Sequence, residues 1–217
     1  FSGLNLSVET LEGLLKHNGP VEDFHLVDEL IGVKKFKNMI NFNTFPSLEA
    51  QISSISDDIA YNNHDIQDGI KANLFRLEEL VEIDFFKNIY RKYKKKINKK
   101  NYKIATYQII RDSIDIMIKD LISNTIKNLN QNKIKSRNDL NKTDFLMVDF
   151  SDKIKNSDNE IRYFLRSKMY NNKNVLYKNN KGKLIIKKLF AKISKNPAKF
   201  ISKEHLSKNK YRSVSDF

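Results

Sequence analysis

The sequence predicts an all-α protein, and three observations lead to that prediction. Helix-interrupting residues are scarce, with 6 Gly and 3 Pro in 217 residues. Long stretches repeat apolar residues at helical spacing. The chain has no Cys, so neither disulfides nor thiolate-bound metal can hold the fold together. A chain of this length with 40% hydrophobic residues can bury a helical core.

The first expected helix begins after Ser7, whose hydroxyl can cap the free backbone N–H groups of the first turn. Gly19-Pro20 ends it. Its apolar positions, about one helical turn apart, are Leu11, Leu14 and Leu15. Residues 21–45 are less regular, and within them residues 32–45 indicate a loop or a short extended piece.

A long helix is expected to open at Pro46-Ser47 and to run to about Leu74. Six of its apolar side chains fall within roughly 60° of one another at 100° per residue, which predicts a stripe that faces the core. They are Leu48, Ile52, Ile55, Ile59, Ile66 and Ile70. The opposite face carries Asp57, Tyr61, His64, Asp65 and Asp68.

This second face has the side chains that a metal-assisted hydrolase needs. A carboxylate can ligate a cation, a ring can stack under a sugar or a base, and a second carboxylate can accept a hydrogen bond from a sugar hydroxyl. Polar residues opposite an apolar stripe are also typical of an ordinary surface helix. Periodicity alone favours the solvated surface, and one Asp with one His does not make a metal site.

The rest of the chain also shows helical periodicity. Further helices are expected over residues 77–96, 101–130, 159–169 and 184–194. The polar segment 130–142 indicates a connection. Residues 145–150 fit either a short strand or a buried loop.

The net charge of +14 and the pI near 9.7 favour a polyanionic partner, such as nucleic acid or a nucleotide. An AT-rich codon bias toward Lys, Asn and Ile would produce much of this charge without a function. The run Tyr90 to Lys103, with its interleaved tyrosines, fits either a platform for single-stranded nucleic acid or a solvated helix end. The solvated helix end is the more common case.

Four segments resemble motifs of bacterial dGTPase-like deoxynucleoside triphosphate triphosphohydrolases of the HD superfamily. They are NLSVETLEGLLKHNGP (5–20), PSLEAQISSISDDIAYNNHDIQDG (46–69), FLRSKMY (164–170) and YRSVSDF (211–217). The resemblance covers most of the chain and is loose over residues 87–156. It implies an HD-domain-like helical bundle, C-terminal part, with the chain truncated at both ends. Residues 1–86 are then the C-terminal part of an HD-type catalytic domain, and residues 87–217 a helical C-terminal region.

The resemblance also implies roles for individual residues. Asp57 matches a metal ligand of the family, Tyr61 the tyrosine against the deoxyribose, and Asp65 the carboxylate that reads the 3′-hydroxyl. Lys16 matches a lysine near the triphosphate. Two histidines of the matching motifs and one arginine chosen for its charge complete the candidate set: His17, His64 and Arg111.

The family's metal site needs a His, a His-Asp pair and a distant Asp. The only His-Asp pair here, His64-Asp65, follows Asp57 on the same helix and is not that motif. We therefore expect an enzyme fragment that needs a divalent metal (Mg, Mn or Fe) and lacks activity alone. The open alternatives are a non-catalytic remnant and a basic helical nucleic-acid-binding module.

The expected partners are a deoxynucleoside triphosphate and, through the basic surface, single-stranded nucleic acid. The resemblance also implies a homo-oligomer, although no residue sets a subunit count. No apolar run approaches the roughly 20 residues that cross a bilayer, so no membrane is expected. With no Cys and no export signal, the expected location is the cytoplasm.

Overall fold

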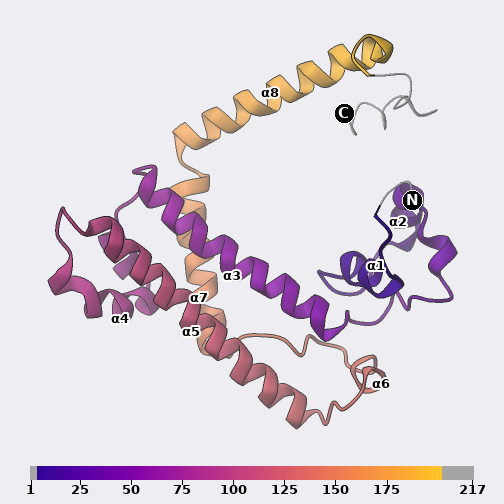
Figure 1. The fold of residues 1–217 in the computed structure, drawn as a ribbon, viewed down its shortest axis with the longest axis horizontal. Helices are drawn as coiled ribbons and strands as arrows, with labels where there is room; N and C mark the ends of the chain where they lie inside the picture. Colours follow the sequence, from indigo (N-terminus) through magenta and orange to yellow (C-terminus); the bar gives the residue numbers. More distant parts are fainter. Residues whose placement is uncertain (1–3, 202–217) are drawn as a thin grey trace. The chain divides into compact units, whose positions relative to one another are not determined.

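The structure, a computed structural model, describes residues 4–201, and every regular element in this range is helical (Figure 1). The predicted all-α class is confirmed. The α-helices are α1 (Val8–Leu15), α2 (Phe24–Ile31), α3 (Leu48–Lys71), α4 (Asp84–Tyr93), α5 (Tyr102–Gln131), α6 (Arg137–Leu140), α7 (Asp152–Leu165) and α8 (Lys173–Lys195). Short turns are η1 (Val33–Phe36), η2 (Leu77–Glu82), η3 (Lys94–Lys96), the π-helical η4 (Arg166–Tyr170) and η5 (Pro197–Lys199).

The chain divides into two compact units, residues 1–165 and 166–217. In the first unit α3 packs against α5 and α7, and α4 packs against α5. The second unit contains η4, α8 and η5. This division does not test the domain boundary expected after residue 86, which stays a prediction. No helix among residues 4–201 is both long and apolar enough to cross a membrane.

The apolar stripe of α3 forms much of the core of the first unit. Ile59, Ile66 and Ile70 are buried, and Leu48 and Ile55 are half-buried, so most of the predicted stripe is confirmed. The prediction is wrong at Ile52, whose side chain is 48% exposed.

The structure differs from the sequence expectation in several helices. Residues 21–45 contain α2, capped by the Asp23 side chain, which accepts a hydrogen bond from Leu26 N at 2.9 Å. This helix ends at Gly32, whose φ of +67° is readily adopted by glycine. The helix expected over 77–96 is divided into η2, α4 and η3, and the last helices begin earlier than expected, as α7 and α8.

The segment 145–150 is a loop that is buried from Met147 onward and not a strand, which settles the choice that its sequence left open. Met147, Val148 and Phe150 are buried there without a strand partner. The Gln51 side-chain oxygen accepts hydrogen bonds from the N–H groups of residues 147 and 148, at 2.9 and 3.0 Å. Asn128 on α5 donates to the Met147 carbonyl at 3.0 Å. Side chains thus satisfy backbone groups that a sheet would otherwise pair.

Candidate functional site

The candidate site begins with the long helix α3. Ser47 caps it by accepting a hydrogen bond from Ala50 N at 3.4 Å, directly after Pro46. Asp57, Tyr61 and Asp65 then follow at intervals of four residues, so they lie along one face of the helix. Asp57 is exposed, Tyr61 is 57% exposed and Asp65 is half-buried.

The carboxylates of Asp57 and its neighbour Asp58 differ in their contacts. Within residues 4–201 no hydrogen bond or ion pair engages Asp57, and its oxygens are therefore open to a ligand. Asp58 forms an ion pair with Arg162 of α7 at 3.1 Å. Of the two adjacent acids, the geometry leaves Asp57 available.

A polar network from α7 fixes the rotation of α3 about its own axis. Asn62 is 3% exposed and donates to Asp158 at 2.9 Å. Arg162 donates to the other oxygen of Asp158 at 2.7 Å. Burial alone would lower the pKa of Arg162, but its bonds with Asp158 and Asp58 outweigh burial and raise that pKa. Because Asp58 and Asn62 are held against α7, Asp57 and Tyr61, one residue earlier, are turned away from it.

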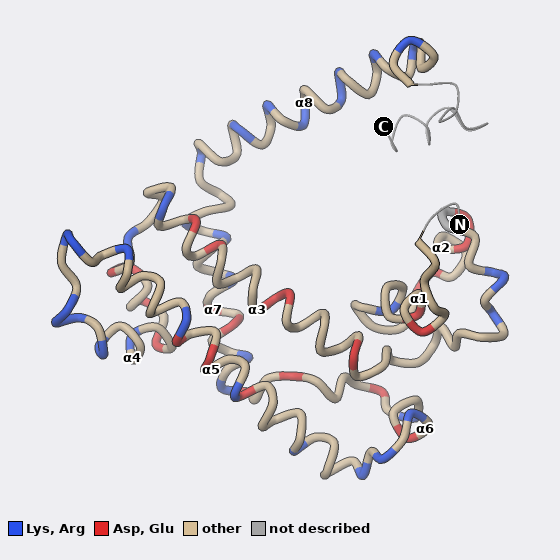
Figure 2. Tube along the Cα trace, viewed as in Figure 1, with Lys and Arg blue, Asp and Glu red and all other residues tan. Residues whose placement is uncertain are grey.

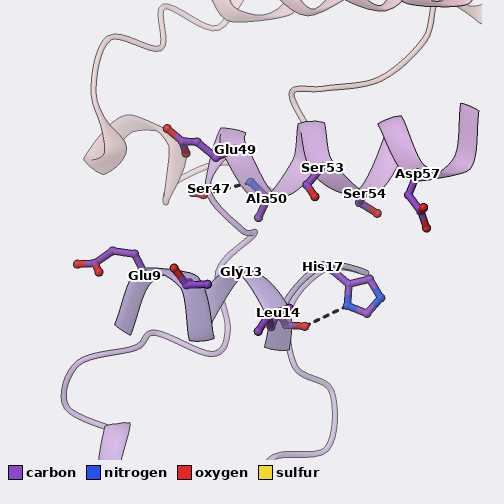
Figure 3. Close-up of a pocket in the computed structure, with 11 residues that line it drawn as sticks. Glu9, Gly13, Leu14, His17, Ser47, Glu49, Ala50, Ser53, Ser54 and Asp57 are labelled. Atoms are coloured by element: carbon purple, nitrogen blue, oxygen red, sulfur yellow. Dashed lines mark hydrogen bonds between the residues drawn. The ribbon is translucent and has the colours of Figure 1, made fainter. Parts of the chain in front are cut away.

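An open groove of about 710 Å³ lies between α1 and the first half of α3 (Figure 3). Asp57 and His17 lie at the same end of it, on α3 and just after α1 respectively. His17 Nδ1 lies 3.0 Å from the carbonyl oxygen of Leu14. A carbonyl can only accept, so Nδ1 carries the proton of this bond. The remaining ring nitrogen of His17 is left for another partner.

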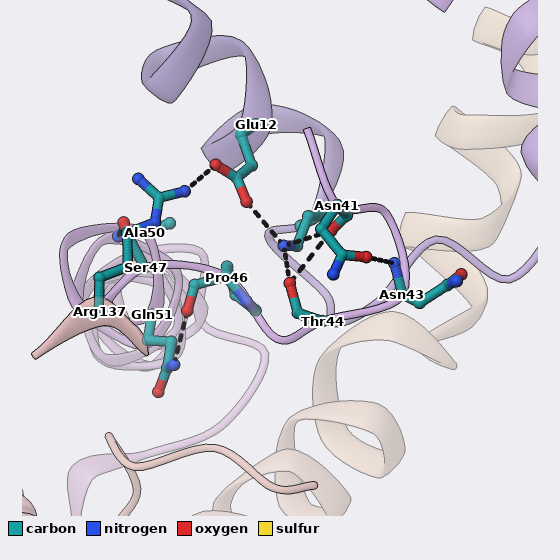
Figure 4. A network of polar contacts seen from close by, with 10 residues as sticks. Glu12, Asn41, Asn43, Thr44, Pro46, Ser47, Ala50, Gln51 and Arg137 are labelled. Atoms are coloured by element: carbon teal, nitrogen blue, oxygen red, sulfur yellow. Dashed lines mark hydrogen bonds and ion pairs between the residues drawn. The ribbon is translucent and has the colours of Figure 1, made fainter. Parts of the chain in front are cut away.

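Lys16 does not line the groove, because its ammonium group lies in a buried network with Glu12, Asn41 and Thr44, three residues labelled in Figure 4. The side chain is 0% exposed and donates to Glu12 at 2.8 Å, to the Asn41 carbonyl at 3.0 Å and to the Thr44 hydroxyl at 2.9 Å. Glu12 also pairs with Arg137. Burial alone would raise the pKa of Glu12, but its hydrogen bonds with Lys16 and Arg137 outweigh burial and lower that pKa.

The structure thus brings some of the predicted site residues together and separates others. Asp57 and His17 share the groove, and Tyr61, His64 and Asp65 continue along α3 beyond it. Arg111 is exposed on α5, near the end of α4. Nothing in the structure tests the individual roles, so all seven assignments stay predictions.

A divalent metal was expected, and Asp57 was its expected ligand. Among residues 4–201 no three His, Cys, Asp or Glu side chains gather closely enough to hold a metal ion. One carboxylate is too few, because protein metal sites use three or more protein ligands in most cases. The described residues therefore do not fit a metal centre by themselves.

The tyrosines of the basic run 90–103 are partly engaged by the fold. The Tyr102 hydroxyl accepts a hydrogen bond from Leu77 N at 2.8 Å. Burial, followed by a hydrogen bond with Asp112, raises the pKa of Tyr93. Tyr90 is half-buried, and burial raises its pKa too. These rings are poorly placed to stack with bases, whereas the lysines around them, whose positions are blue in Figure 2, are exposed.

The sequence interpretation missed the residues that hold α3 in place, namely Asn62, Asp158 and Arg162. One signal was present, because an amide between Ile59 and Ile66 on a buried face needs a polar partner. The partner lies 96 residues away and has no sequence signature. The motif YRSVSDF at 211–217 and His205 lie outside the described residues.

Comparison with known proteins identifies the class of protein. Residues 148–217 match the phosphohydrolase-associated domain. The chain is 59% identical, over its whole length, to the deoxyguanosinetriphosphate triphosphohydrolase-like protein of Pelagibacter ubique and spans 58% of that protein. Similarly named proteins of Rickettsia typhi and Caulobacter sp. are 33% and 31% identical over 88% of the chain, which spans 49% of each.

The chain is therefore an all-α protein that carries a phosphohydrolase-associated domain. More narrowly, it belongs to the family of deoxyguanosinetriphosphate triphosphohydrolase-like proteins, and the predicted family resemblance is confirmed. It spans about half the length of these curated relatives.

Proposed function

We propose that this chain forms one part of a metal-dependent triphosphohydrolase that converts a deoxynucleoside triphosphate and water into deoxynucleoside and triphosphate. The observation that carries the proposal is the exposed face of α3, where Asp57, Tyr61 and Asp65 follow one another at intervals of four residues. The names of the relatives support the same reaction.

Each of the three side chains suits a different part of such a substrate. The open carboxylate of Asp57 provides one oxygen ligand for a divalent cation. The exposed ring of Tyr61, one turn further, offers a flat apolar surface for a deoxyribose. Asp65, one turn beyond, can accept a hydrogen bond from the sugar hydroxyl. We propose that the other metal ligands come from polypeptide outside this chain, and that the chain alone is inactive.

The buried state of Lys16 bears on the phosphate contacts. A lysine with three partners and no exposed surface would have to leave its network to reach a triphosphate. Arg162 does not take its place, because it pairs with both Asp58 and Asp158 on the side of α3 from which Asp57 and Tyr61 are turned away. We therefore assign Lys16 a structural role.

The test is a reconstitution. This chain is mixed with the part of the Pelagibacter ubique relative that it does not match, together with Mg²⁺, Mn²⁺ or Fe²⁺ and each of the four dNTPs. Chromatography then separates deoxynucleoside from the diphosphate and monophosphate. We expect no turnover by the chain alone and metal-dependent release of deoxynucleoside by the mixture.

Two variants of α3 sharpen the test. Asp57→Asn should abolish turnover by the mixture. Asp68→Asn changes an exposed acid near the end of the same helix. It removes only the surface ion pair with Lys71 and should leave turnover unchanged. Robust turnover by the isolated chain, or full activity of Asp57→Asn, would contradict the proposal. A mixture that assembles without turnover would favour the non-catalytic remnant.

A second candidate function is binding of single-stranded nucleic acid by the α4–α5 corner. From Lys87 to Lys103 the chain has many Lys and Arg residues and no acid, and they gather at this corner (Figure 2). Because the tyrosines there are engaged, contacts to phosphates would provide the binding. Affinity measured against salt should fall with a log–log slope of about −0.7 per phosphate contacted. An affinity that does not change with salt would contradict binding of nucleic acid through these phosphate contacts.

A further inference from the structure

Helix α8 has an exposed apolar stripe along one side. Ile185, Leu189 and Ile186 are 49%, 52% and 68% exposed. At 100° per residue these three side chains fall within about 100° of one another. The half-buried Val175 and Ile193 fall in the same arc, near the two ends of the helix. An apolar stripe that runs along a helix and stays open to solvent is typical of a contact face.

The rest of α8 is strongly basic. The helix contains no Asp or Glu, and Figure 2 shows only blue charged positions along it. Its basic residues are Lys173, Lys178, Lys181, Lys183, Lys187, Lys188, Lys192 and Lys195. At the helical rotation of 100° per residue, Lys181, Lys188 and Lys192 lie within about 60° of one edge of the apolar stripe. Lys183 and Lys187 lie within about 100° of the other edge, so exposed lysines flank the stripe on both sides.

This combination of charge and apolar surface restricts the partner. A second copy of α8 would bring its own lysines against these, so two copies repel each other through this face. Nucleic acid would neutralise the lysines and leave the apolar stripe in water. A bilayer surface with anionic headgroups suits both features. Its acyl chains accept the apolar side chains, while the long lysine stems reach the phosphates on either side.

We propose that α8 lies flat on an anionic membrane surface, with Ile185, Ile186 and Leu189 directed toward the acyl chains. The sequence expectation of no membrane rested on the lack of a segment that crosses a bilayer, and a helix that lies in the interface does not cross it. Lysines near an anionic surface add an attraction that salt screens. The proposal is independent of the reaction proposed for α3.

The experiment measures binding of the full chain to sedimented vesicles. One set of vesicles is pure phosphatidylcholine, and the other also contains phosphatidylglycerol. We expect at least about tenfold tighter binding to the anionic vesicles, and a smaller difference in high salt. Circular dichroism confirms that each variant described below remains folded.

Two serine variants test the apolar stripe without changing the charge. Leu189→Ser removes a side chain of the stripe. Leu184→Ser makes the same change on the lysine side of α8, at nearly the same exposure, 53% against 52%. We expect Leu189→Ser to weaken binding to anionic vesicles by about fivefold or more, and Leu184→Ser by less than about twofold.

A second measurement reports which side of α8 meets the lipid. The chain contains no Trp, so the emission of a single introduced Trp reports its own surroundings. On anionic vesicles the emission of Ile186→Trp should shift to the blue, because this side chain enters an apolar environment. The emission of Leu184→Trp should shift much less.

Several results would overturn the inference. One is the absence of binding, or equal binding to both kinds of vesicle. Equal losses in the two serine variants, or equal blue shifts, would show that the lysines act as a general polycation, as they would toward nucleic acid. Finally, the unmatched part of the Pelagibacter ubique relative is added to the chain. Vesicle binding should persist, and its disappearance would show that this polypeptide, rather than lipid, covers the stripe.

Discussion

Replacing Lys16 with methionine should destabilise the fold by about 3 kcal/mol. The change removes three hydrogen bonds from a fully buried ammonium group and leaves the Glu12 carboxylate, whose side chain is 7% exposed, without one of its two cations. Breaking one partner out of a buried ion pair costs about 3–5 kcal/mol. Arg137 still pairs with Glu12, which places the expected loss at the lower end of that range. Methionine keeps most of the packing of the stem, so no large cavity contributes.

The assay is urea unfolding followed by circular dichroism, with the free energy of unfolding compared at constant m-value. Lys71→Met is the matched control, because Lys71 pairs with Asp68 only at the surface. This variant should lower the free energy of unfolding by no more than about 1 kcal/mol. In the double variant Lys16→Met, Glu12→Leu the buried charge is gone as well, and most of the lost stability should return.

A loss below about 1 kcal/mol for Lys16→Met would refute this reasoning. It would mean that the ammonium group contributes little in the buried network and is free to serve the triphosphate, as the sequence resemblance implied. The measurement therefore decides between a structural lysine and a ligand-binding lysine without any need for turnover.

Three further predictions concern the same unit. Gly69→Ala should cost about 1–3 kcal/mol in thermal or urea unfolding, because its Cβ would lie 2.3 Å from the buried ring of Phe75; an unchanged midpoint would show that this ring moves aside freely. Asp158→Ala should cost about 2–3 kcal/mol, because it leaves the buried Asn62 amide without its acceptor; a value near zero would contradict the positioning network. The depressed pKa of Glu12 predicts stability that is fully present above pH 4.5 and is lost as the pH falls below 4.5 through its folded-state pKa; unfolding measured against pH should show this loss, and Glu12→Gln should show less of it.

The sequence predicted the elements that carry their own signals. The cap at Ser47 and the apolar stripe of α3 lie within one local window, so the start of the helix and most of its buried face could be read directly. The short helix α2 was missed, although its capping residue Asp23 lies directly before it in the sequence.

The arrangement of the site depended on distant partners. Asp57 was chosen by motif, but the sequence could not show that Asp58 is held by Arg162 and that Asp57 is left open. Lys16 was placed near the phosphate because its motif suggested it, and burial depends on Asn41 and Thr44, which lie in a loop without periodicity. Contacts between segments this far apart in sequence have no local pattern.

The loop at 145–150 has a consequence for how the chain opens. The amide protons of Met147 and Val148 are held by the Gln51 side chain, so their exchange with solvent requires α3 to separate from this loop. We expect them to exchange as slowly as amides in the middle of α5, and proteases to spare a segment without regular structure. The carboxamide of Gln51 thereby joins the helix α3 and this loop into one cooperative unit of unfolding.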